Sequence, residues 1–178
     1  GAGVMEFKLR CVLEAIEEEE DWFVWSDADV QPFEGLRSAI DAAIVDTEAD
    51  VAAQREFDDC GVNVGFLVIR PTHEAAAMFR RCLALMRQTK GLLDQKCLNG
   101  MILRGEARVS RLPSTFWASS NAMARPTTLV LHHANFVLGD HRRDARDPRP
   151  KLEQLDEVFL LCHHSEAAAA AAAEWDAF

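Results

Sequence analysis

Three features are scarce in this sequence, and each scarcity argues against a class of protein. The 178 residues contain no run of about 18 apolar residues, so no segment is long enough to span a membrane. The first residues lack a basic segment followed by an apolar one, so we expect no signal peptide here. Basic residues are outnumbered: 19 Lys and Arg against 29 Asp and Glu give a formal net charge of −10. A nucleic-acid-binding surface needs a basic patch, so we expect no nucleic-acid partner.

Cysteine pairs with metal-binding or redox spacing are also missing. The sequence has five cysteines, an odd number, and no CxxC. Cys11, Cys82 and Cys97 fall within helical apolar patterns and are predicted to be small core residues. The alternative is that two of the cysteines form a disulfide in an oxidising compartment.

The residues that are present predict an α/β domain. With 49% hydrophobic residues the chain can build a sizeable core. The alternation of helical and strand patterns indicates a mixed sheet. We place this domain in residues 1–162 and a low-complexity, Ala-rich tail in 163–178. The predicted helices cover 5–18, 35–44, 72–88 (capped by Thr72) and 92–103; the predicted strands cover 22–26, 50–54, 61–70, 109–112 and 129–132; residues 151–161 fit either a helix or a strand.

The most informative motif is a pair of aspartates, Asp27 and Asp29, directly after the apolar run at 22–26. Ligands of α/β sheets bind just beyond the carboxyl ends of strands. Two carboxylates there could hold Mg²⁺ or Mn²⁺ against a phosphate-bearing substrate. The alternative is a strand-to-turn junction in which the aspartates cap backbone groups.

Further polar residues interrupt apolar patterns downstream. Asn63 and Gly65 lie inside the strand at 61–70, where a glycine often marks the close approach of a ligand, or else a β-bulge with an internally bonded Asn. Asp94 and Gln95 lie near a helix start, where Asp94 could simply be the N-cap.

The only His-rich and basic cluster of this acidic chain follows the last predicted strand. His132 and His133 precede Gly139, Arg142 and Arg143. A neutral imidazole is a good third metal ligand, and arginines can bind a diphosphate. A charged surface loop is the alternative.

The order of these motifs resembles the nucleotide-diphospho-sugar transferase family, glycosyltransferases with the GT-A fold, and the related retaining galactosyl- and glucosyltransferases. The resemblance rests on Lys8, Trp25-Ser26-Asp27-Ala28-Asp29, Asn63-Val64-Gly65-Phe66, Asp94-Gln95 with Leu98-Asn99, Leu112-Pro113 and His133-Ala134-Asn135. It implies a GT-A-like (Rossmann-related), three-layer domain with a mixed sheet. It also implies sugar transfer from a UDP-sugar donor to a glycan or glycoprotein acceptor, with retention, in the Golgi lumen.

The resemblance assigns a role to each site residue. Asp27, Asp29 and His133, with His132 as a less suitable neighbour, would bind Mn²⁺ or Mg²⁺ against the diphosphate. Lys8 would contact the donor, and Asn63 and Gly65 would line the sugar pocket. Asp94 and Gln95, the candidate catalytic residues, would lie beside the donor sugar and its anomeric carbon, where Gln95 would orient the sugar and stabilise the transition state. Arg142 or Arg143 would take the place of a diphosphate-binding lysine.

One departure from the family pattern stands out. The metal motif comes at residue 27, whereas a GT-A domain normally begins with a strand–helix–strand unit that binds uridine. We therefore expect an N-terminally truncated domain, either a fragment of a longer protein or the product of a degenerate gene. A non-catalytic module that binds sugar nucleotides is one alternative function. A phosphohydrolase of the haloacid-dehalogenase type is another, although Gln31 stands where that class usually has Thr or Val.

Overall fold

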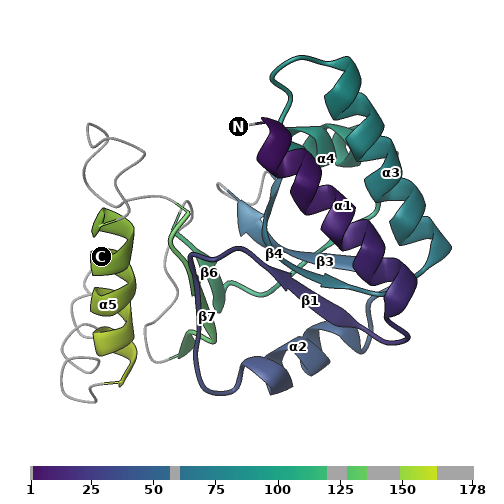
Figure 1. The fold of residues 1–178 in the computed structure, drawn as a ribbon. Helices are drawn as coiled ribbons and strands as arrows, with labels where there is room; N and C mark the ends of the chain where they lie inside the picture. The colour runs from purple at the N-terminus through teal and green to yellow at the C-terminus, as the bar shows by residue number, and fades with distance from the viewer. Residues whose placement is uncertain (1, 57–60, 120–127, 136–148, 164–178) are drawn as a thin grey trace.

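Two small sheets form the centre of the computed structural model of the chain (Figure 1). The structure describes residues 2–56, 61–119, 128–135 and 149–163. The first sheet has the order β1-β4-β3-β5 and is mixed, because β3 pairs antiparallel with β4 and parallel with β5. The second sheet has the order β2-β7-β6. The strands are β1 (Phe23–Ser26), β2 (Val30–Pro32), β3 (Val51–Glu56), β4 (Gly61–Ile69), β5 (Ser110–Arg111), β6 (Phe116–Ala118) and β7 (Leu131–His133).

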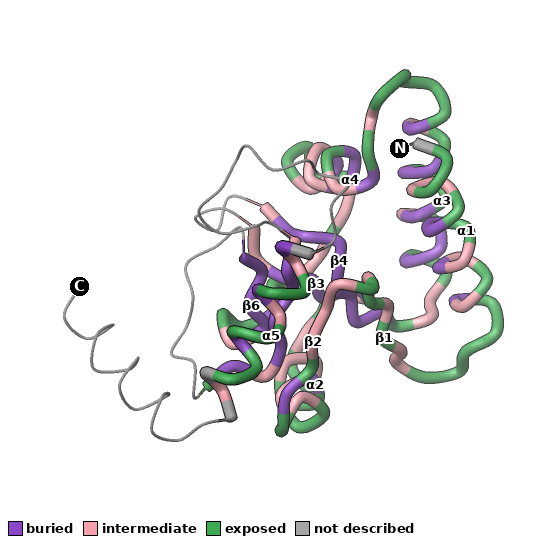
Figure 2. The backbone as a smooth tube through the Cα atoms, turned by 60° about the vertical axis from the view of Figure 1, so that its left-hand side comes forward, coloured by how far each residue is buried: buried purple, intermediate pink, exposed green. Residues whose placement is uncertain are grey.

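Helices cover both faces of the first sheet and make three layers (Figures 1 and 2). On one face, α1 (Ala2–Glu18), α3 (His73–Gln88) and α4 (Asp94–Leu103) enclose the largest apolar cluster. On the other face, α2 (Leu36–Ile44) packs together with residues of the second sheet. The last helix, α5 (Arg149–His163), lies against the second sheet, where Val158 packs near Phe33, Trp117 and Leu129. The predicted three-layer α/β domain with a mixed sheet is therefore present.

A bulge in β4 shapes the centre of the first sheet. Ala53 pairs with Leu67, but the next residue, Gln54, pairs with Asn63, so residues 64, 65 and 66 have no partner in β3. A bulge reverses the inward and outward alternation of a strand. Accordingly Val62 and Val64 face the same apolar cluster as Leu67 and Ile69. Without the bulge, even-numbered and odd-numbered residues of one strand would point to opposite faces of the sheet.

Most predicted elements are confirmed, with shifted ends. Helix α3 begins after Thr72, whose hydroxyl accepts a hydrogen bond from Ala75 N at 3.1 Å, as predicted for its cap. The segment at 151–161 is helical and belongs to α5. Strands β2 and β6, three residues each, were missed because their pattern is too short to stand out. The tail from 164 onward lies outside the described residues.

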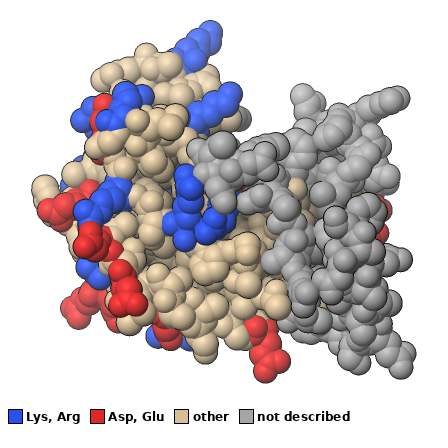
Figure 3. Space-filling model, turned by 180° about the vertical axis from the view of Figure 1, so that it is seen from behind, with Lys and Arg blue, Asp and Glu red and all other residues tan. Residues whose placement is uncertain are grey.

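Charged side chains of both signs are interspersed on the face shown in Figure 3. The surface also carries exposed ion pairs, such as Arg108 with Glu48 at 2.6 Å and Arg80 with Glu17 at 3.0 Å. Pairs of this kind contribute little to stability because water screens them. Within the described ranges, no helix combines the length and apolar character needed to cross a membrane.

Candidate metal and sugar site

The bulge of β4 presents free backbone groups, and four predicted site residues bind them. Val64 O accepts a hydrogen bond from Lys8 Nζ at 2.8 Å, and Val64 N donates to Gln95 Oε1 at 3.4 Å. Gly65 N donates to Asn63 Oδ1 at 2.8 Å, and Gly65 O accepts from Asp27 N at 2.7 Å. Buried peptide groups need partners, so these contacts both satisfy the bulge and fix the side chains around it.

Lys8 is a buried cation at the centre of this arrangement. It lies on α1, and only 8% of the residue is exposed. Its ammonium donates to Asp27 Oδ1 at 2.8 Å and lies 3.6 Å from Asp94 Oδ2. One buried charge thus joins the carboxylate that follows β1 to the carboxylate that begins α4. A lysine held between carboxylates is a compact point charge that positions both of them.

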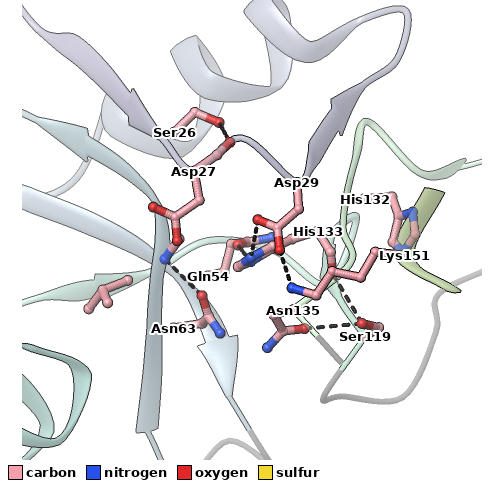
Figure 4. A network of polar contacts seen from close by, with 12 residues as sticks. Ser26, Asp27, Asp29, Gln54, Asn63, Ser119, His132, His133, Asn135 and Lys151 are labelled. Carbon is pink, nitrogen blue, oxygen red and sulfur yellow. Dashed lines mark hydrogen bonds and ion pairs between the residues drawn. The ribbon is translucent and has the colours of Figure 1, made fainter. Parts of the chain in front are cut away.

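Asp27, Asp29 and His133 converge beside the bulge, as Figure 4 shows. One ligand atom from each lies within 4.8 Å of the others. His133 Nε2 faces Asp29 Oδ1 at 3.3 Å. The backbone positions the pair, because Ala134 N donates to Asp29 O at 3.0 Å where β2 and β7 run antiparallel. Two carboxylates and an imidazole are a donor set that suits Mn²⁺ or Mg²⁺.

Lys151 of α5 also contacts Asp29. Its ammonium pairs with Asp29 Oδ2 (Figure 4). Burial would raise the pKa of the Asp29 carboxyl, but hydrogen bonds and charges from His133 and Lys151 outweigh burial. The pKa of Asp29 therefore lies well below its usual range, and this carboxylate is ionised at neutral pH.

A carboxylate that the sequence analysis did not predict, Glu56, lies beside Asn63 and Gln95. Glu56 Oε2 accepts hydrogen bonds from Asn63 Nδ2 at 2.7 Å and from Gln95 Nε2 at 3.1 Å. Asn63 and Gln95 therefore use both ends of their amides within the protein, one end on the bulge and the other on Glu56. Both amides are therefore held in place by the protein, and the role of Gln95 beside a donor sugar stays a prediction.

One cavity of about 480 Å³ brings these groups together. Its lining includes all the predicted residues that the structure describes, and in addition Glu56 and Lys151, among others. The predicted residues are Lys8, Asp27, Asp29, Asn63, Gly65, Asp94, Gln95 and His133. Residues from α1, β4, α4, β7 and α5 thus meet around a single space.

The structure bears on three alternatives that the sequence left open. Asp94 is not the N-cap of α4: Leu93 takes that position, and Asp94 is buried and turned toward Lys8. His133 is 3% exposed, so it does not lie on a surface loop. Asn63 is internally bonded at a bulge, but that bulge also borders the cavity.

His132 lies apart from the cluster. Neighbouring residues of a strand point to opposite faces, and His132 stacks on Trp117 with ring centroids 4.6 Å apart. Its Nε2 lies 3.1 Å from the amide nitrogen of Gln154. Burial, together with the charge of His133, lowers the pKa of His132 to about 4. Arg142 and Arg143 lie outside the described residues.

The missed residues had weak signals in the sequence. Glu56 follows the predicted strand at 50–54 and precedes further acidic residues, so nothing distinguished it from a solvated charge. Lys151 is a single lysine after an Arg-rich stretch, and Gln54 was one polar residue in a short strand. Only the fold places the three around His133 and the bulge.

Comparison with known proteins supports the fold. No protein-family model matches the sequence, and no curated protein matches it either. Among solved structures, the chain is similar to the crystal structure of a glycosyltransferase involved in the glycosylation of the major capsid of PBCV-1. The two are 16% identical with a TM-score of 0.54, and the match covers 74% of this chain and 73% of that chain. At this identity the likeness establishes a glycosyltransferase-like fold.

Proposed function

We propose that this chain is a divalent-metal-dependent glycosyltransferase that takes a UDP-sugar donor and transfers the sugar, with retention, to a glycan or glycoprotein. The observation that carries the proposal is the convergence of Asp27, Asp29 and His133 within 4.8 Å, beside a cavity of about 480 Å³. The glycosyltransferase-like fold supports it. The Golgi-lumenal location implied by the family resemblance stays a prediction.

The residues present fit a divalent cation. His133 Nε2 and Asp29 Oδ1 face each other at 3.3 Å, a spacing that lets the two atoms share one cation. Asp27, Asp29 and His133 would hold Mn²⁺ or Mg²⁺. The ion, when bound, would neutralise negative charge on the departing diphosphate.

The other residues would arrange the donor around this centre. Lys8 keeps Asp27 and Asp94 in place through a buried ammonium. Lys151 adds positive charge beside Asp29, where a diphosphate would lie. Glu56 and Asp94 offer carboxylate oxygens to sugar hydroxyls, while Asn63 and Gln95 hold Glu56. An amide is a poor nucleophile, so we assign retention to a front-face displacement or a short-lived ion pair.

Calorimetric titration tests the proposal. Wild-type protein is titrated with UDP in the presence and absence of Mn²⁺, and the titration is repeated with Asp29→Ala and with the control Asp46→Ala. Asp46 is exposed on the segment after α2. We expect Mn²⁺ to strengthen UDP binding to the wild type and the control but not to Asp29→Ala. Equal UDP binding with and without Mn²⁺ would reject the metal-bridged site. Metal-dependent UDP binding without hydrolysis or transfer of UDP-glucose or UDP-galactose would favour the non-catalytic alternative.

A further inference from the structure

Gln54 is a buried polar residue that touches the candidate metal ligand His133. It lies on β3 at the register shift opposite the bulge, and its exposure is 0%. Gln54 Oε1 lies 3.0 Å from His133 Nδ1, and Gln54 Nε2 donates to Phe116 O at 3.3 Å. Figure 4 shows Gln54 beside the His133 ring. The side chain thus links β3 to both neighbouring strands of the second sheet, β6 and β7.

The contact with Phe116 fixes the orientation of the Gln54 amide. A backbone carbonyl only accepts hydrogen bonds, so the NH₂ end of the amide must face Phe116 O. The carbonyl end then faces His133 Nδ1, and a carbonyl oxygen needs a donor there. The ring proton of His133 therefore belongs on Nδ1, which leaves the lone pair of Nε2 directed at the carboxylate side of the site.

Asp29 competes for the same ring proton from the opposite side. Its Oδ1 lies 3.3 Å from His133 Nε2, and a carboxylate is a strong acceptor. If Asp29 took the proton on Nε2, the atom that can bind a cation would be blocked. Gln54 Oε1 and His133 Nδ1 would then meet as two acceptors in a fully buried place, an arrangement that costs free energy because neither has water.

We propose that Gln54 is a positioning residue that keeps the His133 ring proton on Nδ1 and so holds Nε2 open as a ligand for a divalent cation. The part that concerns the cation rests on the proposed function. The part that concerns the ring proton does not. An outer partner that fixes a histidine's tautomer commonly changes metal affinity by roughly tenfold to a hundredfold.

Long-range ¹H–¹⁵N spectra of the metal-free protein test the ring proton. The chain has six histidines, so the His133 signals are identified by their loss in His133→Ala. In alkaline buffer we expect the wild-type ring to carry its proton on Nδ1, and the Gln54→Met ring to carry it on Nε2, donated to Asp29. A wild-type ring protonated on Nε2 would overturn the proposal, even if Gln54→Met failed to fold.

Mn²⁺ binding, followed by electron paramagnetic resonance, tests the consequence. We expect Gln54→Met to bind Mn²⁺ about tenfold more weakly than the wild type or more. The matched control is Gln154→Met, which removes another buried glutamine that contacts the neighbouring His132. This control should bind Mn²⁺ within about twofold of the wild type, since His132 stands outside the metal cluster.

The outcomes separate the two proposals. A folded Gln54→Met protein with unchanged Mn²⁺ affinity and an unchanged ring spectrum would overturn the positioning role. A wild type that binds no Mn²⁺ but shows the proton on Nδ1 would reject the proposed function, while the spectrum would still support the effect of Gln54 on the ring.

Discussion

A Cβ atom on Gly65 would lie 2.0 Å from Cε1 of His133. The imidazole therefore fills the space that a side chain at position 65 would take. Real Cβ atoms essentially never come closer than 3.0 Å to another heavy atom. The glycine inside β4 is thus explained by the approach of His133 rather than by a turn.

Gly65→Ala is expected to displace His133 and weaken the cation site. Overpacking a buried position costs about 1–3 kcal/mol, and here it also moves a metal ligand. We expect a lower urea midpoint and at least about tenfold weaker Mn²⁺ binding. Gly3→Ala is the control, because Gly3 lies in α1 and, apart from its chain neighbours and the adjacent backbone of that helix, no atom lies within 4 Å of its Cβ position. That change should leave Mn²⁺ binding intact; equal behaviour of the two variants would contradict the steric argument.

Lys8→Met is expected to destabilise the fold by about 3–5 kcal/mol, because it leaves Asp94 as a buried carboxylate without its cation. The double variant Lys8→Met/Asp94→Asn should recover much of the loss in a urea unfolding experiment. Arg37→Met, which breaks an exposed pair with Asp41, should leave the midpoint unchanged. A double variant no more stable than Lys8→Met alone would show that the pair is not coupled.

Lys151→Met is expected to change cation and nucleotide binding in opposite directions. Without the ammonium on Asp29, Mn²⁺ alone should bind about threefold more tightly, the size expected for a half-exposed pair. UDP in the presence of Mn²⁺ should bind more weakly, since a positive charge near its diphosphate is lost. Lys90→Met, on an exposed turn, serves as the control. Unchanged Mn²⁺ affinity would mean that Lys151 does not compete for Asp29.

Glu56→Gln is expected to weaken binding of the sugar and spare that of the nucleotide. A hydrogen bond to a charged group contributes enough for roughly a tenfold change in affinity. Calorimetry with UDP, UDP-glucose and UDP-galactose in the presence of Mn²⁺ should show the loss for at least one sugar nucleotide and none for UDP. The exposed Glu34→Gln variant controls for lost charge. A parallel loss for UDP would place Glu56 on the nucleotide instead.

Stability is expected to fall as the pH drops from about 6.5 to about 4, in part because of His132. Burial lowers the pKa of His132 in the folded state to about 4, so in this range the unfolded chain binds more protons. The stability that depends on neutral His132 is fully present above pH 6.5, and about 3 kcal/mol of it is lost by about pH 4. His132→Phe keeps a ring against Trp117 and should flatten this part of the pH profile of unfolding free energy. Identical slopes of unfolding free energy against pH in the wild type and in His132→Phe would contradict this role of His132.

The sequence predicted the elements with strong periodicity and missed those that depend on distant contacts. The apolar run at 61–70 identified β4, yet the bulge at 64–66 arises only when β3 pairs on both sides of it. Asp27 and Asp29 could be chosen because they follow a strand. Lys151 could not, because no local pattern tells that α5 returns to Asp29.

The residues of the candidate site divide in the same way, into those that the local sequence predicts and those that depend on distant contacts. His133 was expected from motif order, whereas its partner Gln54 is visible only in three dimensions. Asp94 looked like a helix cap because its local sequence suits one, but its burial beside Lys8 gives it a different partner. Local chemistry therefore predicts which residues belong to the site, and tertiary contacts decide how each is held.

The lysines that hold the aspartates also set the charge balance of the cavity. Four carboxylates line the cavity, Asp27, Asp29, Glu56 and Asp94, together with three lysines, Lys8, Lys96 and Lys151, which gives a formal sum of −1. A divalent cation alone would turn this sum to +1, and an anionic diphosphate alone would make it more negative. Each ligand therefore relieves the charge that the other introduces. By thermodynamic reciprocity, Mn²⁺ should raise the affinity for UDP by the same factor by which UDP raises the affinity for Mn²⁺.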